Sequence, residues 1–297
     1  KNAIRRTTRY TQFIGGSTMK TIGVIGAGTM GIGVAISLLQ KKISVRLIDI
    51  DKDQIGRAKT EIENKIAIYS MLRGIDIDEE VTKKNILYST DIQTLKYADI
   101  IIENISENIE EKKKIYHSLE SICKKDCIFM INTSCIPIKD IAQDLSIKTH
   151  MLGVHFMNPV PLIDAVEVIQ AESTSEGVLS EALLFLKGLG KDSIVVHDSP
   201  GFVSNRISHL MMNEAIFLVD EGVAKPEDID KIFKCCYGHK MGPLETADLI
   251  GLDVVKDTLS IMGEYFEGNK FKIAPLLERM VAENNLGRKT GKGFYKY

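Results

Sequence analysis

The sequence predicts an α/β protein in which a doubly wound parallel-sheet domain is followed by an all-helical domain. Short apolar runs alternate with longer helical periods through the first two thirds of the chain, a pattern typical of βαβ units. Strand-like runs end near Asp198, and helical periodicity dominates from there to the C-terminus. The length of 297 residues corresponds to about two domains.

The first domain begins with an apolar, β-branched strand at Thr21–Ile25, followed by a helix through 34–39 and a second strand at 45–48. Further short apolar runs predict strands at 100–102, 128–131, 151–154, 166–169 and 193–196. Together they indicate a doubly wound sheet with extra strands at its end. Apolar residues at helical spacing predict helices at 207–219, 229–235, 254–262 and 276–281.

Residues 1–18 contain four basic and no acidic side chains and end in GGST before Met19. We interpret this segment as a leader outside the fold, and a vector-derived tail is a simpler explanation than a transit peptide. Residues 19–198 then form the α/β domain, and residues 199–297 form the helical domain.

The composition excludes several classes of function. A formal net charge of −2 provides no strong field for nucleic acid or an anionic membrane surface, and no apolar run approaches the roughly 20 residues of a membrane span. The five cysteines are an odd number without the paired spacing of a zinc site, and the six histidines lack the H-x-x-x-H spacing of a metal-binding helix. We therefore expect a cytoplasmic protein with reduced thiols and no metal.

A glycine-rich turn follows the first strand and opens a helix. In GAGTMG, Gly26 permits the tight turn, Gly28 lets the backbone approach a pyrophosphate, and Gly31 allows close packing of helix on strand. Thr29 and Met30 lie at the helix N-terminus, where unpaired N–H groups and the helix dipole favour a phosphate. The pattern predicts a Rossmann-type dinucleotide site; a turn without a ligand is the structural alternative.

Asp49 ends the second predicted strand. A carboxylate at this place accepts hydrogen bonds from an adenosine ribose and repels a 2′-phosphate. The sequence therefore predicts NAD in preference to NADP.

His155 and Glu167 lie in two apolar runs separated by Asn158-Pro-Val-Pro161. A turn centred near Pro161 would make them cross-strand neighbours. A carboxylate beside an imidazole fixes its tautomer and stabilises the imidazolium, as needed by a histidine that takes a proton from an alcohol. The alternative is a satisfied buried histidine with an outward-facing glutamate.

Eight segments, in order along the chain, resemble those of the (S)-3-hydroxyacyl-CoA dehydrogenases, including the bacterial 3-hydroxybutyryl-CoA dehydrogenases. They are GAGTMG at 26–31, NTS at 132–134, HFMNPV at 155–160, VEV at 166–168, PGFVSNR at 200–206, MGP at 241–243, DLIGLD at 248–253 and GRKTGKGFY at 287–295.

The resemblance implies reversible hydride transfer between the β-carbon of a 3-hydroxyacyl thioester and NAD. It assigns His155 as general base and Glu167 as its orienting carboxylate, and it places Ser134 and Asn205 on the oxygen atoms of the substrate. Without the resemblance, Ser134 would be a turn residue at a strand end and Asn205 a polar residue at a helix start.

The resemblance also implies further cofactor contacts. Glu107, Lys112 and Asn158 match positions around the nicotinamide-side ribose, and Lys289 matches a contact from the C-terminal tail. For Lys112 the alternative is a solvated charge in the run at 110–114. A homodimer through the helical domain is implied as well.

The sequence leaves open whether the acyl group is carried by coenzyme A or by an acyl carrier protein. Members of the family contact coenzyme A from the helix after the second strand, but the corresponding segment 62–73 has Lys65 and few other basic residues. Short-chain acyl-CoA is the leading prediction, and a hydroxyacyl group on an acyl carrier protein is the rival. Two further hypotheses are a dehydrogenase of free hydroxyacids or sugar acids and a noncatalytic NAD(H)-binding protein.

Overall fold

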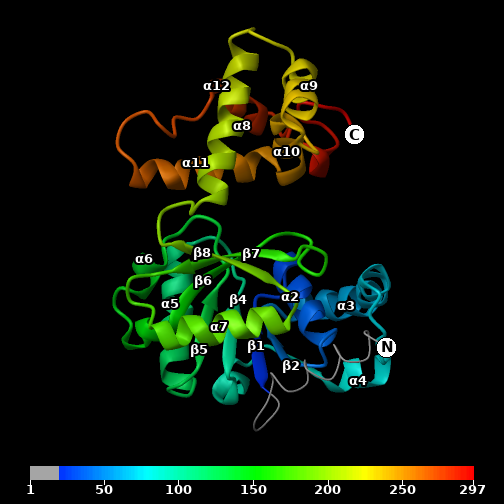
Figure 1. The fold of residues 1–297 in the computed structure, drawn as a ribbon, viewed down its shortest axis with the longest axis vertical. Coiled ribbons are helices and arrows are strands. Elements are labelled where there is room, and N and C mark those ends of the chain that lie inside the picture. The colour runs from blue at the N-terminus through cyan, green and yellow to red at the C-terminus, as the bar shows by residue number, and fades with distance from the viewer. Residues whose placement is uncertain (1–19) are drawn as a thin grey trace, which may run out of the picture. The chain divides into compact units, whose positions relative to one another are not determined.

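A computed structural model describes residues 20–297, and the predicted leader at 1–18 lies outside the described residues (Figure 1). The chain divides into two compact units. The first contains residues 20–133 and Ile138–Asp198; the second contains Ser134–Pro137 and Ser199–Tyr297.

The first unit is built on one sheet, with the strand order β3-β2-β1-β4-β5-β6-β7-β8. Every neighbouring pair is parallel except β6 and β7, which are antiparallel. The strands are β1 Thr21–Ile25, β2 Ser44–Ile48, β3 Ile86–Ser89, β4 Ile100–Glu103, β5 Ile128–Ile131, β6 Met151–Phe156, β7 Ala165–Gln170 and β8 Asp192–His197.

Helices connect the parallel strands and pack on the sheet (Figure 1). They are α2 Thr29–Leu39, α3 Lys52–Arg73, α4 Glu79–Lys84, α5 Ile109–Ile122, α6 Ile138–Ala142 and α7 Glu176–Gly188, with short 3-10 turns at Ile92–Tyr97 and Ser146–His150. Side chains at the helix starts explain several boundaries: Asp51 accepts from Asp53 N, Asn108 from Glu110 N, and Ser175 from Val178 N.

The core of this unit is formed by the strands together with α2, α3 and α7. All four residues of β4 and of β5 are buried, and α2 is buried along most of its length. Strands covered on both faces read as continuous apolar runs, which explains why the pattern predicted them.

The second unit is helical. It consists of α8 Ser204–Asp220, α9 Pro226–Tyr237, α10 Pro243–Ile250, α11 Leu252–Tyr265, α12 Pro275–Ala282 and a short turn at Arg288–Thr290. Two buried carboxylates accept hydrogen bonds from segments of this unit that are distant in sequence. Asp230 accepts from Leu244 N and from the hydroxyl of Tyr295, and Asp248 accepts from Phe294 N and Tyr295 N.

The predicted fold class is confirmed, and each predicted strand and helix is present within a few residues of its expected bounds. The elements that were not predicted include strand β3 and helices α4, α6, α7 and α10. Strand β3 is a half-buried edge strand of four residues, and the buried face of α10 includes the carboxylate of Asp248, so neither has a continuous apolar pattern. Within residues 20–297, none of the helices combines the length and the apolar character of a membrane span.

Candidate active site

The glycine turn between β1 and α2 has the conformation that its residue types predict. Gly26 has φ +89°, and a Cβ there would lie 2.5 Å from the carbonyl oxygen of Asn104. A Cβ on Gly31 would lie 1.8 Å from the carbonyl oxygen of Gly26, so α2 packs directly on the turn. A Cβ on Gly28 would meet nothing within 4 Å. The turn is therefore tight on two sides and open at Gly28, where a pyrophosphate would approach.

The N-terminus of α2 suits an anion. The first N–H groups of a helix have no partner within it, and they include those of Thr29 and Met30. The N-cap residue, Gly28, has no side chain to cap them, and the first turn contains no acidic residue. These residues fit the pyrophosphate of a dinucleotide.

Asp49 lies against the same turn. Its Oδ2 accepts from Ala27 N at 2.8 Å, and its Oδ1 accepts from Asp51 N at 2.9 Å. A carboxylate has about four lone-pair sites, so two backbone bonds leave capacity for ribose hydroxyls. The two bonds hold the carboxylate beside the glycine turn, as the prediction requires.

His155 and Glu167 face each other across β6 and β7. They are directly opposite in the antiparallel register, with His155 Nδ1 3.2 Å from Glu167 Oε2. Their residues are 7% and 6% exposed. The predicted cross-strand pairing is confirmed, and the alternative of an outward-facing glutamate is wrong.

Glu107 and Asn158 follow β4 and β6, at the edge of the sheet that also holds Gly26 and Asp49. The strands are parallel up to β6, so their carboxyl ends share this edge, where open α/β sheets bind ligands. Glu107 is half-buried and accepts from the Thr133 hydroxyl at 2.6 Å, whereas Asn158 is exposed.

Lys112 is not a solvated charge, so that interpretation is wrong. Its side chain is fully buried, and its ammonium lies 2.8 Å from Oε1 of Glu103. It also donates to the carbonyl oxygen of Asn132 at 3.3 Å. Burial raises the pKa of Glu103, and the neighbouring ammonium opposes that shift. Sequence reasoning missed this pair because Glu103 ends an apolar run and Lys112 lies in the middle of the charged run at 110–114.

Asn132 links the buried pair to the strand of His155. Its side-chain amide donates to Asn104 Oδ1 at 2.9 Å, and its Oδ1 accepts from Phe156 N at 3.3 Å. Phe156 follows His155 directly. Asn132 belongs to the NTS segment that carries part of the resemblance, but no role was predicted for it.

In the second unit, Asn205 at the start of α8 donates from Nδ2 to the carbonyl oxygen of Ser134 at 2.7 Å. The structure thus brings together the two residues that the resemblance placed on the substrate oxygens. Lys289 forms an ion pair with Asp253 near the start of α11.

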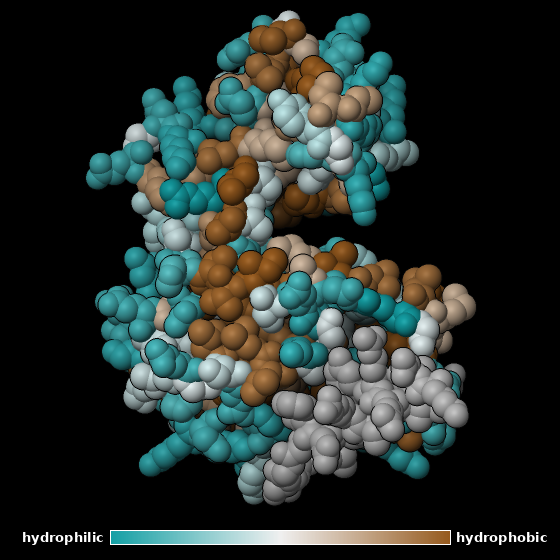
Figure 2. Space-filling view, viewed as in Figure 1, coloured by the Kyte–Doolittle hydropathy of each residue, from teal (hydrophilic) through white to brown (hydrophobic). Residues whose placement is uncertain are grey.

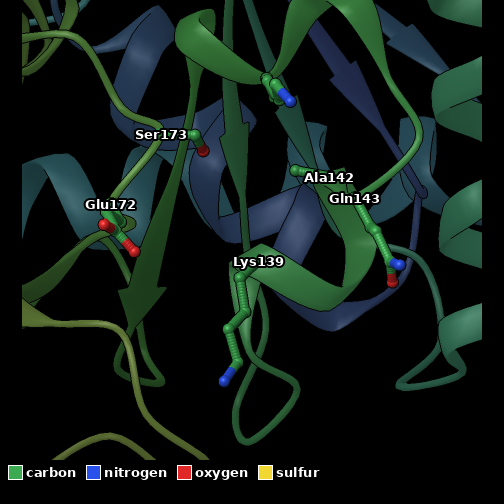
Figure 3. Close-up of a pocket in the computed structure, with 6 residues that line it drawn as sticks. Lys139, Ala142, Gln143, Glu172 and Ser173 are labelled. Atoms are coloured by element: carbon green, nitrogen blue, oxygen red, sulfur yellow. The ribbon is translucent and has the colours of Figure 1, made fainter.

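A surface pocket of about 360 Å³ lies elsewhere on the first unit (Figure 3). The polar ends of Lys139, Gln143 and Glu172 do not converge on one point. The pocket is lined by Lys139, Ala142, Gln143, Lys148, Glu172 and Ser173 and contains none of the predicted site residues. In the part of the chain that the structure describes, no group of three or more histidine, cysteine, aspartate or glutamate side chains is arranged to hold a metal.

A doubly wound sheet with an open glycine turn, a carboxylate beside that turn and a buried histidine–glutamate pair is typical of an NAD-dependent oxidoreductase. The 3-hydroxyacyl-CoA dehydrogenase NAD-binding domain matches residues 21–199, and the C-terminal domain of the same family matches residues 201–297. The chain belongs to the 3-hydroxyacyl-CoA dehydrogenase family.

Relatives support this assignment over nearly the whole chain. A probable 3-hydroxybutyryl-CoA dehydrogenase of Deinococcus radiodurans is 40% identical over 93% of this chain and 99% of its own length. A protein of the same description from Bacillus subtilis is 37% identical over 94% and 98%. The crystal structure of (S)-3-hydroxybutyryl-CoA dehydrogenase PaaH1 from Ralstonia eutropha superposes with a TM-score of 0.88, at 36% identity, over 94% of this chain and 99% of that one.

Proposed function

We propose that this protein interconverts (S)-3-hydroxyacyl and 3-oxoacyl thioesters with NAD, and that its substrates are short-chain acyl-CoA thioesters. The observation that carries the proposal is the buried pairing of His155 with Glu167 on adjacent strands of a dinucleotide-binding sheet. The relatives named 3-hydroxybutyryl-CoA dehydrogenase support the acyl-CoA substrate and the short chain.

The pair has the chemistry of a general base and its orienting partner. An ionised carboxylate only accepts hydrogen bonds, so Glu167 holds the proton of His155 on Nδ1 and assigns proton exchange with the substrate hydroxyl to Nε2. When His155 takes that proton, the charge of Glu167 stabilises the imidazolium. In reduction of the ketone, the same imidazolium returns the proton to the oxygen.

Other residues bind the reactants in this proposal. The turn Gly26–Gly31 and Asp49 hold the dinucleotide, and bound NAD supplies the hydride acceptor or donor for the β-carbon. Ser134 and Asn205 hydrogen-bond the substrate oxygens, and Glu107, Asn158 and Lys289 contribute further cofactor contacts. Because the ammonium of Lys112 is enclosed by Glu103 and Asn132, we assign Lys112 a supporting role rather than a direct cofactor contact.

One observation favours the acyl-carrier-protein alternative. The two basic residues of segment 62–73 are already engaged within the protein: Lys65 pairs with Glu61 at 2.5 Å, and Arg73 pairs with Asp164 and donates to the carbonyl oxygen of Pro161. A phosphopantetheine arm without the adenosine 3′-phosphate does not need a basic helix.

The test is loss of NADH absorbance with acetoacetyl-CoA and, in parallel, with an acetoacetyl acyl carrier protein. We expect rapid turnover of the CoA thioester. Activity on the carrier-bound thioester alone would overturn the acyl-CoA proposal. No turnover of either thioester, together with turnover of a free hydroxyacid, would favour a free-acid dehydrogenase. NADH binding without turnover of any of these substrates would favour a noncatalytic protein.

We also propose a homodimer through the helical unit. Apolar side chains are exposed on its helices, including Ile232 and Tyr237 on α9 and Leu249 on α10, and Figure 2 shows apolar residues on the surface of this unit. Sedimentation of the full chain tests it, with a dimer expected.

We also propose that the protein is located in the cytoplasm. Its five cysteines are an odd number, which favours reduced thiols and therefore a reducing compartment.

A further inference from the structure

Lys191 is a buried lysine whose ammonium contacts two backbone carbonyls. It lies between α7 and β8 and is 6% exposed. Its Nζ donates to the carbonyl oxygens of Val160 at 2.5 Å and Ile163 at 2.6 Å. Both carbonyls belong to residues 157–164, which connect β6 to β7 and which we call the hairpin loop.

The hairpin loop is held from two further elements. Arg73, the last residue of α3, donates from Nε to the carbonyl oxygen of Pro161 at 2.8 Å and pairs with Asp164. On α2, a Cβ added to Gly33 would lie 3.1 Å from Val160, so the dinucleotide-binding helix packs directly on the loop. Three elements that are distant in sequence therefore fix one short connection.

The position of this loop matters because it joins the strands of the catalytic pair. His155 precedes the loop on β6 and Glu167 follows it on β7, and the two are opposite only in the observed register. A shift of the loop changes how the two strands meet, and hence the distance between the imidazole and the carboxylate. Hydrogen bonds from a charged donor are stronger than neutral ones, so the ammonium of Lys191 is well suited to hold the loop.

We propose that Lys191 is a positioning residue for the reaction: by binding the carbonyls of Val160 and Ile163, it holds the hairpin loop in the conformation that pairs His155 with Glu167. The inference rests on the proposed catalytic role of that pair. Neither the resemblance nor the sequence pattern assigned Lys191 a role.

The surroundings of Lys191 make its charge sensitive to pH. Burial, together with the cations Arg73 and Lys41, lowers its pKa to about 8, and Asp164 opposes this shift. Loss of the proton removes the charge and one N–H donor from the contact with the loop. An arginine at this position would stay charged. We therefore expect an alkaline loss of turnover near pH 8 that moves to higher pH in Lys191→Arg.

The test compares Lys191→Met and Lys191→Arg, with Lys187→Met as the control because Lys187 is exposed on the neighbouring helix α7. For acetoacetyl-CoA reduction we expect Lys191→Met to lower kcat about tenfold or more, with NADH affinity within about twofold. Lys191→Arg should stay within about threefold of wild type, and Lys187→Met should be unchanged. A folded Lys191→Met with wild-type kcat, or equal losses in the two Lys191 variants, would overturn the proposal.

If Lys191→Met does not fold, the pH profile of kcat for Lys191→Arg tests the proposal instead. An alkaline decrease in kcat at the same pH as in wild type would count against the proposal.

A measurement without substrate separates this inference from the proposed function. In protein with ¹⁵N-labelled histidine, the Nδ1 proton of His155, assigned by its absence in His155→Ala, should be sharp in wild type and in Lys187→Met. It should broaden or shift in Lys191→Met, and an unchanged signal would remove Lys191 from the positioning of the pair whatever the substrate.

Discussion

The ammonium of Lys112 lies between the two carboxylate oxygens of Glu103, 2.8 Å from Oε1 and 3.0 Å from Oε2, with both side chains fully buried. Ile105 N donates to the same carboxylate at 2.6 Å, and the hydroxyl of Tyr116 lies 3.5 Å from it. A buried pair gains little over apolar residues of the same size, but removing one partner leaves the other charge uncompensated. Loss of either partner would therefore destabilise the strand end from which Asn104 and Glu107 extend.

Lys112→Met should lower the free energy of unfolding by about 3–5 kcal/mol, because it leaves the carboxylate of Glu103 without its cation. Denaturation in urea measures the loss. Lys112→Met combined with Glu103→Gln should recover much of it, since no buried charge remains. Lys114→Met, at an exposed position of the same helix, serves as the control. A single variant as stable as wild type would show that Glu103 is not charged in the folded protein.

His155→Gln should lower kcat by about 10²- to 10⁴-fold, the range for loss of a general base. NADH affinity, measured by fluorescence titration, should change by less than about twofold because the glycine turn is a separate element of the fold. Glu167→Gln should lower kcat less than His155→Gln, because it removes the orienting charge but leaves the imidazole. Turnover near the wild-type rate in His155→Gln would remove this residue from the mechanism.

Gly28→Ala and Gly31→Ala form a matched pair within one turn. The new Cβ of Gly28→Ala enters open space, so stability should be nearly unchanged while NADH affinity falls. The Cβ of Gly31→Ala would lie 1.8 Å from a backbone oxygen, so stability should fall by about 1–3 kcal/mol or more. Thermal unfolding and NADH titration separate the two effects. Full NADH affinity in Gly28→Ala would mean that the pyrophosphate does not approach this glycine.

Asp49→Asn should narrow the preference for NADH over NADPH by roughly tenfold or more, because the repulsion between the carboxylate and a 2′-phosphate is lost. Asparagine keeps an acceptor oxygen for Ala27 N, so the glycine turn should stay folded. The ratio of kcat/KM for the two cofactors measures the change. An unaltered ratio would place the adenosine ribose away from Asp49.

The free energy of unfolding should depend on pH in the way that the lowered pKa of Lys191 predicts. Its pKa is lowered to about 8 from an ordinary value of 10.5, so between these two pH values the unfolded chain binds more protons than the folded one. The contribution of Lys191 to stability therefore rises with pH across this window, opposite to its proposed effect on turnover. The difference in unfolding free energy between wild type and Lys191→Met, measured from pH 7.5 to about 10.5, should grow with pH. A flat difference would indicate an ordinary pKa for this lysine.

The sequence predicted those features that arise from residues close together along the chain. The glycine turn, Asp49 at a strand end and the facing of His155 and Glu167 follow from strand, turn and helix within one or two consecutive units. Strand β3 was missed because it is only half-buried, and helix α10 because its buried face includes the carboxylate of Asp248, which interrupts the apolar pattern.

By itself, the sequence determined the fold class, most strands of the sheet and the dinucleotide turn, because these are properties of short segments and their spacing. The type of reaction came from the resemblance of eight such segments to a known family. Only the tertiary structure decided that Lys112 is buried on Glu103, that Asn132 links this pair to the strand of His155, and that Lys191 and Arg73 hold the hairpin loop. A lysine on a helix surface and a lysine in the core have the same local pattern. Burial and partner are set by residues distant along the chain, which meet only when the sheet and its helices pack together.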